Sequence, residues 1–303
     1  MVEKNFKAIE GLRGYLALWV AVGHAMQLAG YLDPPGPLKI VMQGGAAVEV
    51  FMIVSGFVIS HLILVKGERY DAYIVRRFFR LYPCFLICCA IGFLSLPLWS
   101  SVVHQFHWSA SGWPTYVAGV DALQHETSEN FRAHAILHAL MLHGAVPAEV
   151  LPKAPMTFLP AAWSISLEWQ FYIVAPAVLA LTKGAGRLAA LVFIALGAHV
   201  LYLKGVFGSF EVESHIAGSM GLFAIGIVSR LALENLRAMR LNPLNWTLIT
   251  FALSVILFKQ FLAVAVWLPF YGYIVWGGDA NRSERFFDFL FSNTATTIKV
   301  HLF

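Results

Sequence analysis

The sequence predicts an all-α protein, a polytopic bundle of about eight transmembrane helices, and three observations support this. Of the 303 residues, 59% are hydrophobic and only 13% are charged, about half the charged fraction of an ordinary soluble domain. The mean hydropathy of +0.70 leaves too few polar residues to cover a soluble protein of this length. The apolar residues also gather in runs of about 20, the length that crosses a bilayer as a helix.

Eight apolar runs have the length and composition of membrane spans. They are residues 12–31, 45–65, 83–99, 161–182, 188–204, 215–233, 243–258 and 261–278. A weaker run at 131–150 contains three histidines and either crosses the membrane or lies at its surface. We therefore predict eight spans, with eight to ten as the range.

The basic residues predict the orientation, because lysine and arginine concentrate in cytoplasmic loops. Lys4, Lys7 and Arg13 place the N-terminus in the cytoplasm, and the densest cationic stretch follows the second span. Residues 100–130 contain almost no lysine or arginine and are expected outside. If 131–150 does not cross, the later basic connections also lie inside. We therefore predict one domain, 1–303, in which 100–160 is a mostly extracytoplasmic segment.

Ionisable side chains inside these runs are the candidate functional residues, because burying them in a membrane is costly. Arg13 and His24 lie eleven positions apart in the first run. This spacing is about three helical turns, or ~16 Å, so both side chains share one face. They either line an interior channel, or Arg13 reaches lipid phosphate and His24 bonds to a neighbouring helix.

Arg77 and Arg80 stand just before the third run. On a helix they are neighbours at i and i+3, and their two guanidinium groups can hold one phosphate group. The alternative is an anchor at the inner membrane face that binds no ligand.

Glu168 stands about one turn into the fourth run, among Trp163, Trp169 and Tyr172. An aromatic belt at the membrane surface explains the rings but not a carboxylate at that depth. A buried carboxylate needs a cation or a hydrogen-bond donor beside it. On the predicted topology Glu168 and His24 both lie in the outer half of the membrane, where they can meet.

The other chemistry-bearing residues are less specific. His134, His138 and His143 come without an evident third or fourth ligand in a known metal-site spacing, so no metal site is predicted. The chain has no block of like charges of the kind that binds nucleic acid.

Four motifs follow one another in the first part of the chain. They are Gly11-Leu12-Arg13-Gly14 with His24, Glu49–Phe57, Arg77-Phe78-Phe79-Arg80, and Trp163–Glu168 followed by Phe171-Tyr172 and Pro176. In content and order they resemble the motifs of the acyltransferase-3 family of membrane-bound O-acyltransferases. The resemblance implies about ten helices, and Thr296–Phe303 does not match the motif common in the family's last helices, which are therefore expected to be missing.

The resemblance implies transfer of an acyl group, most often acetyl, from cytoplasmic acyl-CoA to a hydroxyl of a sugar, a surface polysaccharide or a small natural product. His24 would be the general base and Glu168 would orient it. Arg77 and Arg80 would hold the phosphates of coenzyme A. Arg13 would either help to hold these phosphates or polarise the thioester oxygen. No permanently bound cofactor is expected, and the partners are acyl-CoA, a carbohydrate or other hydroxyl acceptor, and the lipid bilayer. The expected location is a bacterial inner (plasma) membrane.

Two other functions fit the same residues. A transporter of acyl groups or small anions would use His24 and Glu168 to relay protons and Arg13 to bind the anion. A shortened, catalytically silent relative would bind coenzyme A without turnover.

Overall fold

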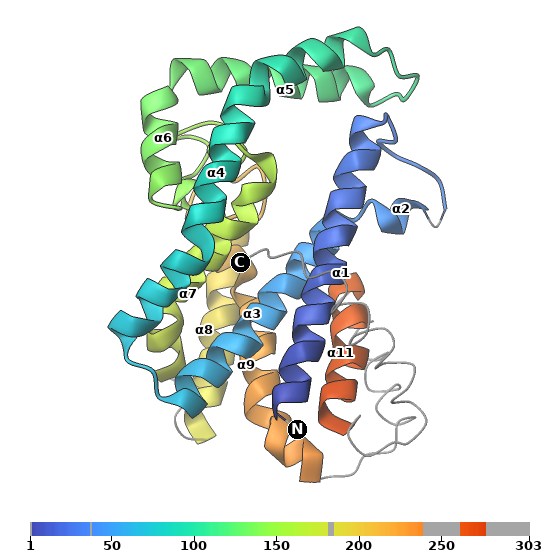
Figure 1. The fold of residues 1–303 in the computed structure, drawn as a ribbon. Helices are drawn as coiled ribbons and strands as arrows, with labels where there is room; N and C mark the ends of the chain where they lie inside the picture. Colours follow the sequence, from blue (N-terminus) through green and yellow to red (C-terminus); the bar gives the residue numbers. More distant parts are fainter. Residues whose placement is uncertain (1, 37, 181–184, 239–260, 277–303) are drawn as a thin grey trace. The chain divides into compact units, whose positions relative to one another are not determined.

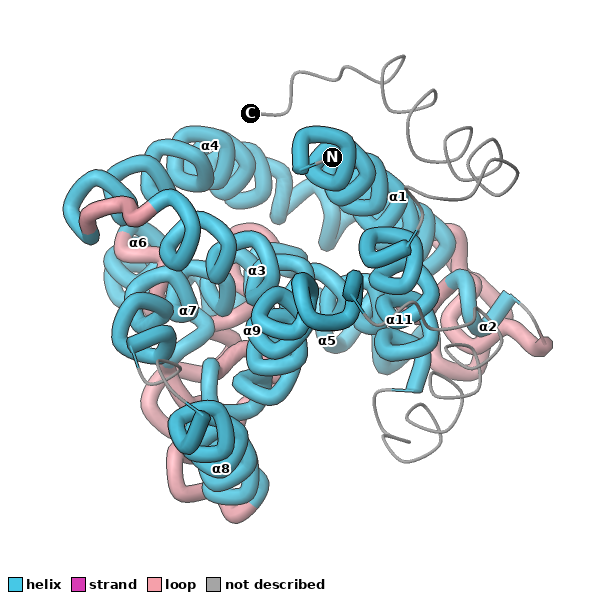
Figure 2. Tube along the Cα trace, turned by 90° about the horizontal axis from the view of Figure 1, so that it is seen from below, coloured by secondary structure: helices cyan, strands magenta, loops and turns pink. Residues whose placement is uncertain are grey.

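The computed structural model describes residues 2–36, 38–180, 185–238 and 261–276, as helices joined by loops and turns (Figure 1). In the tube view of Figure 2 these residues are coloured as helix or loop only. The predicted all-α class is therefore confirmed for the part of the chain that is described. The predicted span 243–258 lies outside it.

The helices follow one another along the chain with mostly short connections. They are α1 (Val2–Leu28), α2 (Leu38–Val41), α3 (Gly44–Lys66), α4 (Tyr70–Gln105), α5 (Trp113–Glu129), α6 (Phe131–Ala139), the 3-10 helices η1 (His143–Ala145) and η2 (Pro160–Ala162), α7 (Trp163–Ala180), α8 (Ala185–Leu203), α9 (Ile216–Ala238) and α11 (Phe261–Trp276).

Three of the described helical stretches are long and apolar enough to cross a membrane. They are Gly44–Leu64, Tyr70–Gln105 and Ile216–Leu233, and two shorter apolar helices, Phe193–Leu203 and Leu262–Val275, accompany them. All five coincide with predicted spans. The predicted runs 12–31 and 161–182 lie on α1 and α7, and the total of about eight spans stays a prediction.

Helix α4 is longer than the span predicted from hydropathy. It begins at Tyr70 rather than at residue 83 and has 36 residues, about 54 Å at 1.5 Å per residue. The apolar run marks only the part that suits a bilayer, whereas the backbone hydrogen bonds of a helix continue into water. The arginine run is therefore helical, and Arg77 and Arg80 are neighbours at i and i+3 on α4.

The chain divides into two compact units. The first comprises Met1–Ala29, Pro34–Val58 and Ile225–Phe303, and the second comprises Gly30–Asp33 and Ile59–Ala224. In the first unit, the Trp19 indole donates to the carbonyl of Val41 at 2.9 Å and holds α2 beside α1. The Tyr271 hydroxyl donates to the carbonyl of Ser229 at 2.5 Å and joins α11 to α9.

In the second unit, α5 packs against the end of α4 through polar contacts. Asp121 of α5 lies 2.9 Å from Nε2 of His104 and accepts a hydrogen bond from the Ser100 hydroxyl at 3.2 Å. The indole of Trp113 donates to the carbonyl of Phe106 at 2.8 Å, which holds the turn between the two helices.

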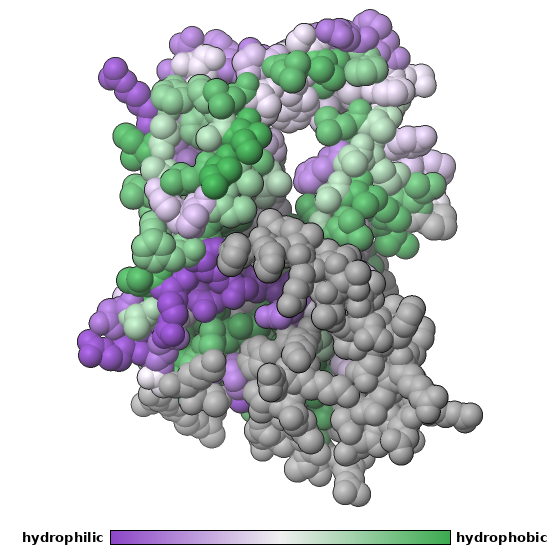
Figure 3. All heavy atoms as spheres, in the orientation of Figure 1, coloured by the Kyte–Doolittle hydropathy of each residue, from purple (hydrophilic) through white to green (hydrophobic). Residues whose placement is uncertain are grey.

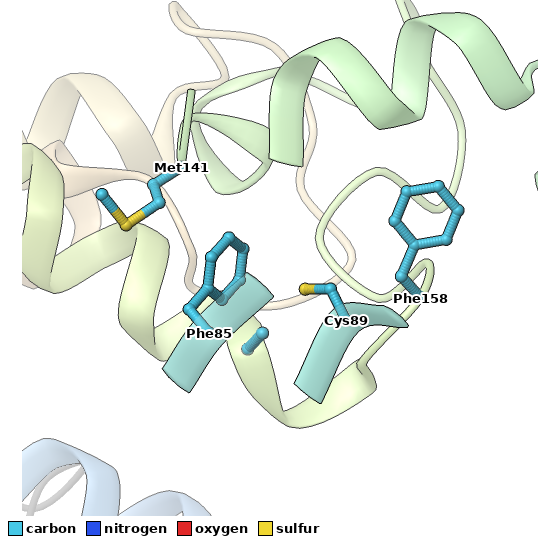
Figure 4. Close-up of a cluster of buried hydrophobic side chains, with 5 residues drawn as sticks. Phe85, Cys89, Met141 and Phe158 are labelled. Carbon is cyan, nitrogen blue, oxygen red and sulfur yellow. The ribbon is translucent and has the colours of Figure 1, made fainter. Parts of the chain in front are cut away.

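Residues 131–162 fold into short elements that pack on the same stretch of α4 that the sequence identified as a span. Helix α6 has nine residues, about 14 Å, and cannot cross a ~30 Å hydrocarbon core by itself. Figure 4 shows Met141 and Phe158 from this segment beside Phe85 and Cys89 of α4. Gly92 of α4 lies against the backbone carbonyl of Phe158, where a Cβ atom has no room.

Candidate functional site

The beginning of α4 carries a concentrated group of charged side chains. Figure 3 shows a hydrophilic band over this part of the second unit, whereas the later part of the helix carries mainly apolar side chains. Arg69 pairs with Asp71 at 3.0 Å, and Arg76 pairs with Glu68. The side chain of Glu68 is 8% exposed, whereas those of Arg69 and Arg76 are 84% and 64% exposed. Both guanidinium groups are therefore available to an anion from solution.

These residues surround a cavity of about 470 Å³, which we call the arginine cavity. The lining contains three guanidinium groups and one carboxylate, so its net charge is positive. The lining residues are Leu62, Glu68, Arg69, Ala72, Arg76 and Arg77. Of the two arginines singled out from the sequence, Arg77 lines the arginine cavity and Arg80 is not among its lining residues. A cavity of this size and charge suits a ligand with more than one phosphate group.

Arg77 also connects the arginine cavity to Glu168. The Arg77 guanidinium lies over the ring of Tyr172 of α7, with Cζ 5.9 Å from the ring centroid, within the range of a cation–π interaction. The Tyr172 hydroxyl donates to Oε1 of Glu168. Glu168 is only 8% exposed, so its hydrogen bond with Tyr172 offsets part of the cost of burying a carboxylate.

The structure brings Glu168 near the arginine run, a proximity that the sequence did not indicate, because Tyr172 contacts both Glu168 and Arg77. The placement of Glu168 in the outer half of the membrane stays a prediction. Residues 141–162 pack along α4 near Phe85, and α7 begins beside that level, because Ala162 belongs to the same cluster. Nearly two turns later Trp169 packs on Phe78, with ring centroids 6.0 Å apart. An apolar run gives the length of a span but not the depth at which the helix begins.

Arg13 and His24 both lie on α1, in the first unit. The Arg13 guanidinium lies over the ring of Phe51 of α3 at 5.9 Å. His24 is exposed, and its Nδ1 lies 3.2 Å from Oε1 of Gln27 one turn on. Because His24 and Glu168 belong to different units, their pairing stays a prediction.

Tyr73 is the buried polar residue that sequence reasoning missed. It lies one helical turn before Arg77, its ring packs edge-on against Tyr172 at 6.4 Å, and only 1% of it is exposed. The spacing of four residues from Arg77 was the only signal in the sequence, and it is too common to single out one tyrosine. Tyr172 was visible in the sequence, but an aromatic belt explained it equally well.

Metal ligands do not gather in the part of the chain that the structure describes. No group of three His, Cys, Asp or Glu side chains there is arranged to hold a metal ion. His138 and His143 instead stack on each other with ring centroids 4.0 Å apart.

Comparison with known proteins agrees with the motifs. The family model described as an acyltransferase domain, acyltransferase 3, matches residues 6–280, which include every candidate residue discussed above. No curated protein and no solved structure gives a significant match. The family and the apolar helices together identify an integral membrane protein. The chain belongs to the acyltransferase-3 family, as its motifs predicted.

Proposed function

We propose that this protein is a membrane O-acyltransferase that moves an acyl group, acetyl in the simplest case, from acyl-CoA to a hydroxyl group. The acceptor would be a sugar, a surface polysaccharide or a small natural product. The arginine cavity carries this proposal, because it offers a positively charged site of suitable size for a donor with several phosphates. Membership of the family supports the acyl-transfer chemistry.

In the proposed complex, Arg69, Arg76 and Arg77 hold the phosphates of coenzyme A. A phosphate between guanidinium groups makes charge-assisted, often bidentate hydrogen bonds, which are stronger than neutral ones. Arg80 lies one turn beyond Arg77 on the same helix and would guide the donor toward the arginine cavity. Arg13 keeps its predicted role on α1, as a further cation for the donor.

The transfer step needs a base for the acceptor hydroxyl. The hydroxyl oxygen attacks the thioester carbonyl carbon, the carbon–sulfur bond breaks, and the coenzyme A sulfur leaves. Neutral His24 takes the hydroxyl proton and then returns it to the sulfur, which gives the free thiol. A positioned general base typically contributes ~10²–10⁴-fold to such a rate.

Glu168 was expected to orient His24, as the carboxylate does in a catalytic triad. Its hydrogen bond to Tyr172, beneath Arg77, supports a second role at the donor site. Because the carboxylate holds Tyr172 in place, it also holds the surface on which Arg77 rests. The orientation that accompanies this proposal has the start of α4 and the N-terminus in the cytoplasm, where acyl-CoA is found, in a bacterial inner membrane.

The test is mass spectrometry of surface glycans and small metabolites from three kinds of cell. One kind makes the natural chain, one lacks it, and one makes His24→Ala. We expect a shift of one acetyl unit in the first kind only. His125→Ala, at an exposed histidine of α5, is the matched control and should leave the shift unchanged.

Other outcomes identify the rival functions. Uptake of an acyl group or a small anion into sealed vesicles, without any acylated product, would indicate a transporter. Binding of coenzyme A without turnover on any hydroxyl would indicate a silent relative. An unchanged acetyl shift in His24→Ala would remove His24 from the mechanism.

A further inference from the structure

Two hydrogen-bonding groups beside the arginine cavity have no partner among the described residues. They are the hydroxyl of Tyr73 and the Nε–H group of Arg77, and both atoms are buried. Buried polar atoms in proteins are nearly always hydrogen-bonded, so each such exception asks for an explanation. These two side chains lie one turn apart on the same face of α4. Both contact the same ring of Tyr172.

Both groups can donate, so a single acceptor oxygen can satisfy the two of them. Arg Nε–H is a donor only, and a tyrosine hydroxyl donates one hydrogen bond. Glu168 receives the hydroxyl of Tyr172 but is hydrogen-bonded neither to the Tyr73 hydroxyl nor to Arg77 Nε. The unmet donors at Tyr73 and Arg77 therefore match an oxygen atom that a ligand brings.

The surroundings favour an uncharged oxygen over a phosphate. Tyr73 is almost completely buried, and removing an anion entirely from water costs far more than removing a carbonyl group. The exposed guanidinium groups of Arg69 and Arg76 offer phosphates a much less costly place.

We propose that Tyr73 and Arg77 form a subsite for a carbonyl oxygen in the acyl-pantetheine arm of the donor, inward from the phosphates in the arginine cavity. This inference rests on the proposed function. The carbonyl belongs either to an amide of the arm or to the thioester itself. The subsite makes Tyr73 a substrate-binding residue, and it makes Arg77 the residue shared between the two parts of the donor.

The test compares three ligands on the purified full-length protein in lipid nanodiscs. They are adenosine 3′,5′-bisphosphate, which carries phosphates but no arm, free coenzyme A, which has the amides, and acetyl-CoA, which adds the thioester. In Tyr73→Phe we expect about a tenfold loss of affinity for acetyl-CoA, the size of one buried hydrogen bond. Affinity for adenosine 3′,5′-bisphosphate should stay unchanged. An equal loss for coenzyme A assigns the subsite to an amide, and no loss for coenzyme A assigns it to the thioester.

The melting temperature of Tyr73→Phe gives a second readout, which is expected to stay equal or rise while the affinity for acetyl-CoA falls. Tyr73→Phe keeps the ring against Tyr172 and removes only a hydroxyl that has no described partner. The free variant should therefore melt at the same or a higher temperature than the natural protein. Tyr70→Phe is the matched control, because Tyr70 lies in the same turn with its side chain exposed, and it should change neither binding nor melting.

Three results would overturn the subsite. An equal loss of affinity for adenosine 3′,5′-bisphosphate would mean that Tyr73 binds a phosphate. Unchanged affinity for all three ligands would remove Tyr73 from the donor site. A lower melting temperature would mean that the hydroxyl already has a partner in the free protein. If the natural protein binds none of the three ligands, the proposed function fails, and the subsite fails with it.

Discussion

Along the helix pair α4 and α7, two groups of titratable side chains are buried in different ways. At the start of α4, Arg77, Tyr172 and Glu168 are joined by a cation–π contact and a hydrogen bond beside a charged cavity. About two turns further along α4, His138 and His143 stack on each other and on Phe85 inside an apolar cluster. In the first group a guanidinium and a carboxylate each have a partner in the Tyr172 side chain. In the second group the histidine side chains are neutral.

The histidines are buried in the form that costs least. His138 Nδ1 donates to the carbonyl of His134 at 2.8 Å, and His143 Nε2 donates to the carbonyl of Ala162 at 3.2 Å. Each neutral ring therefore carries its proton on the bonded nitrogen, and the other nitrogen is bare. Burial lowers the pKa of His138 to about 4 and also lowers the pKa of His143 well below its ordinary value. Along this helix pair, the charged groups thus lie beside the arginine cavity, and the histidines of the packed segment are neutral.

The largest expected effect comes from breaking the packing that holds the histidine group on α4. In Gly92→Ala the new methyl group would overlap the backbone carbonyl of Phe158, which cannot move away as a flexible side chain can. We expect a loss of about 3 kcal/mol in the free energy of unfolding, at the upper end for overpacking, measured by denaturant unfolding in detergent. Gly119→Ala on α5 has open space around it and should stabilise by about 0.5–1 kcal/mol. Equal stability of the two variants would contradict the close approach.

The second prediction concerns acid. The pKa of His138 is about 4 in the folded protein, against an ordinary value of 6.5 for an exposed histidine, so between these values the unfolded chain binds the extra proton. The contribution of His138 to the free energy of unfolding is therefore fully present above pH 6.5. It decreases by about 3 kcal/mol as the pH falls toward 4. Unfolding followed between pH 7 and 4 measures the loss. His138→Phe should remove much of it.

Other titratable groups near His138 also influence the loss of stability at low pH. His143 adds to it in the same direction, because burial also lowers its pKa. His134, whose pKa is lowered by burial, lies 3.6 Å from Glu126, which opposes the shift. His125→Gln, at an exposed position of α5, should leave the pH profile as it is. A flat profile in the natural protein would mean that the imidazoles are already solvated.

The third prediction tests the pairing at the charged end. A double-mutant cycle with Tyr172→Phe and Glu168→Gln should give a coupling of about 2 kcal/mol, the range for hydrogen bonds to charged groups. The readout is the free energy of unfolding of the four proteins. A coupling near zero would show that Tyr172 and Glu168 act independently, and Arg77 would then lack the support described above.

The smallest effect on stability is expected at the mouth of the arginine cavity. Arg69 and Asp71 form an exposed pair, and such pairs contribute less than about 1 kcal/mol. Arg69→Gln should therefore leave the melting temperature almost unchanged and weaken binding of adenosine 3′,5′-bisphosphate several-fold, with a reduced dependence on salt. A large loss of stability with unchanged binding would mean that Arg69 is structural.

Several features could be predicted from the sequence because they depend on local pattern and composition. Apolar runs identified helices around 45–65, 83–99 and 215–233, and the spacing of Arg77 and Arg80 placed both on one helix. The four motifs identified the family, which the match over residues 6–280 confirms. The start of α4 was missed, because a polar stretch that continues a helix resembles a loop in hydropathy.

By itself, the sequence determined that this protein is helical, lies in a membrane and belongs to an acyltransferase family, since hydropathy and motif order are read along the chain. Only the tertiary structure decided that Glu168 joins Arg77 through Tyr172, that the Tyr73 hydroxyl beside them has no partner among the described residues, and that residues 131–162 pack against α4. The physical reason is that these contacts join residues far apart in sequence. The position and orientation of these side chains depend on how two helices pack against each other, and a local sequence pattern does not contain that information.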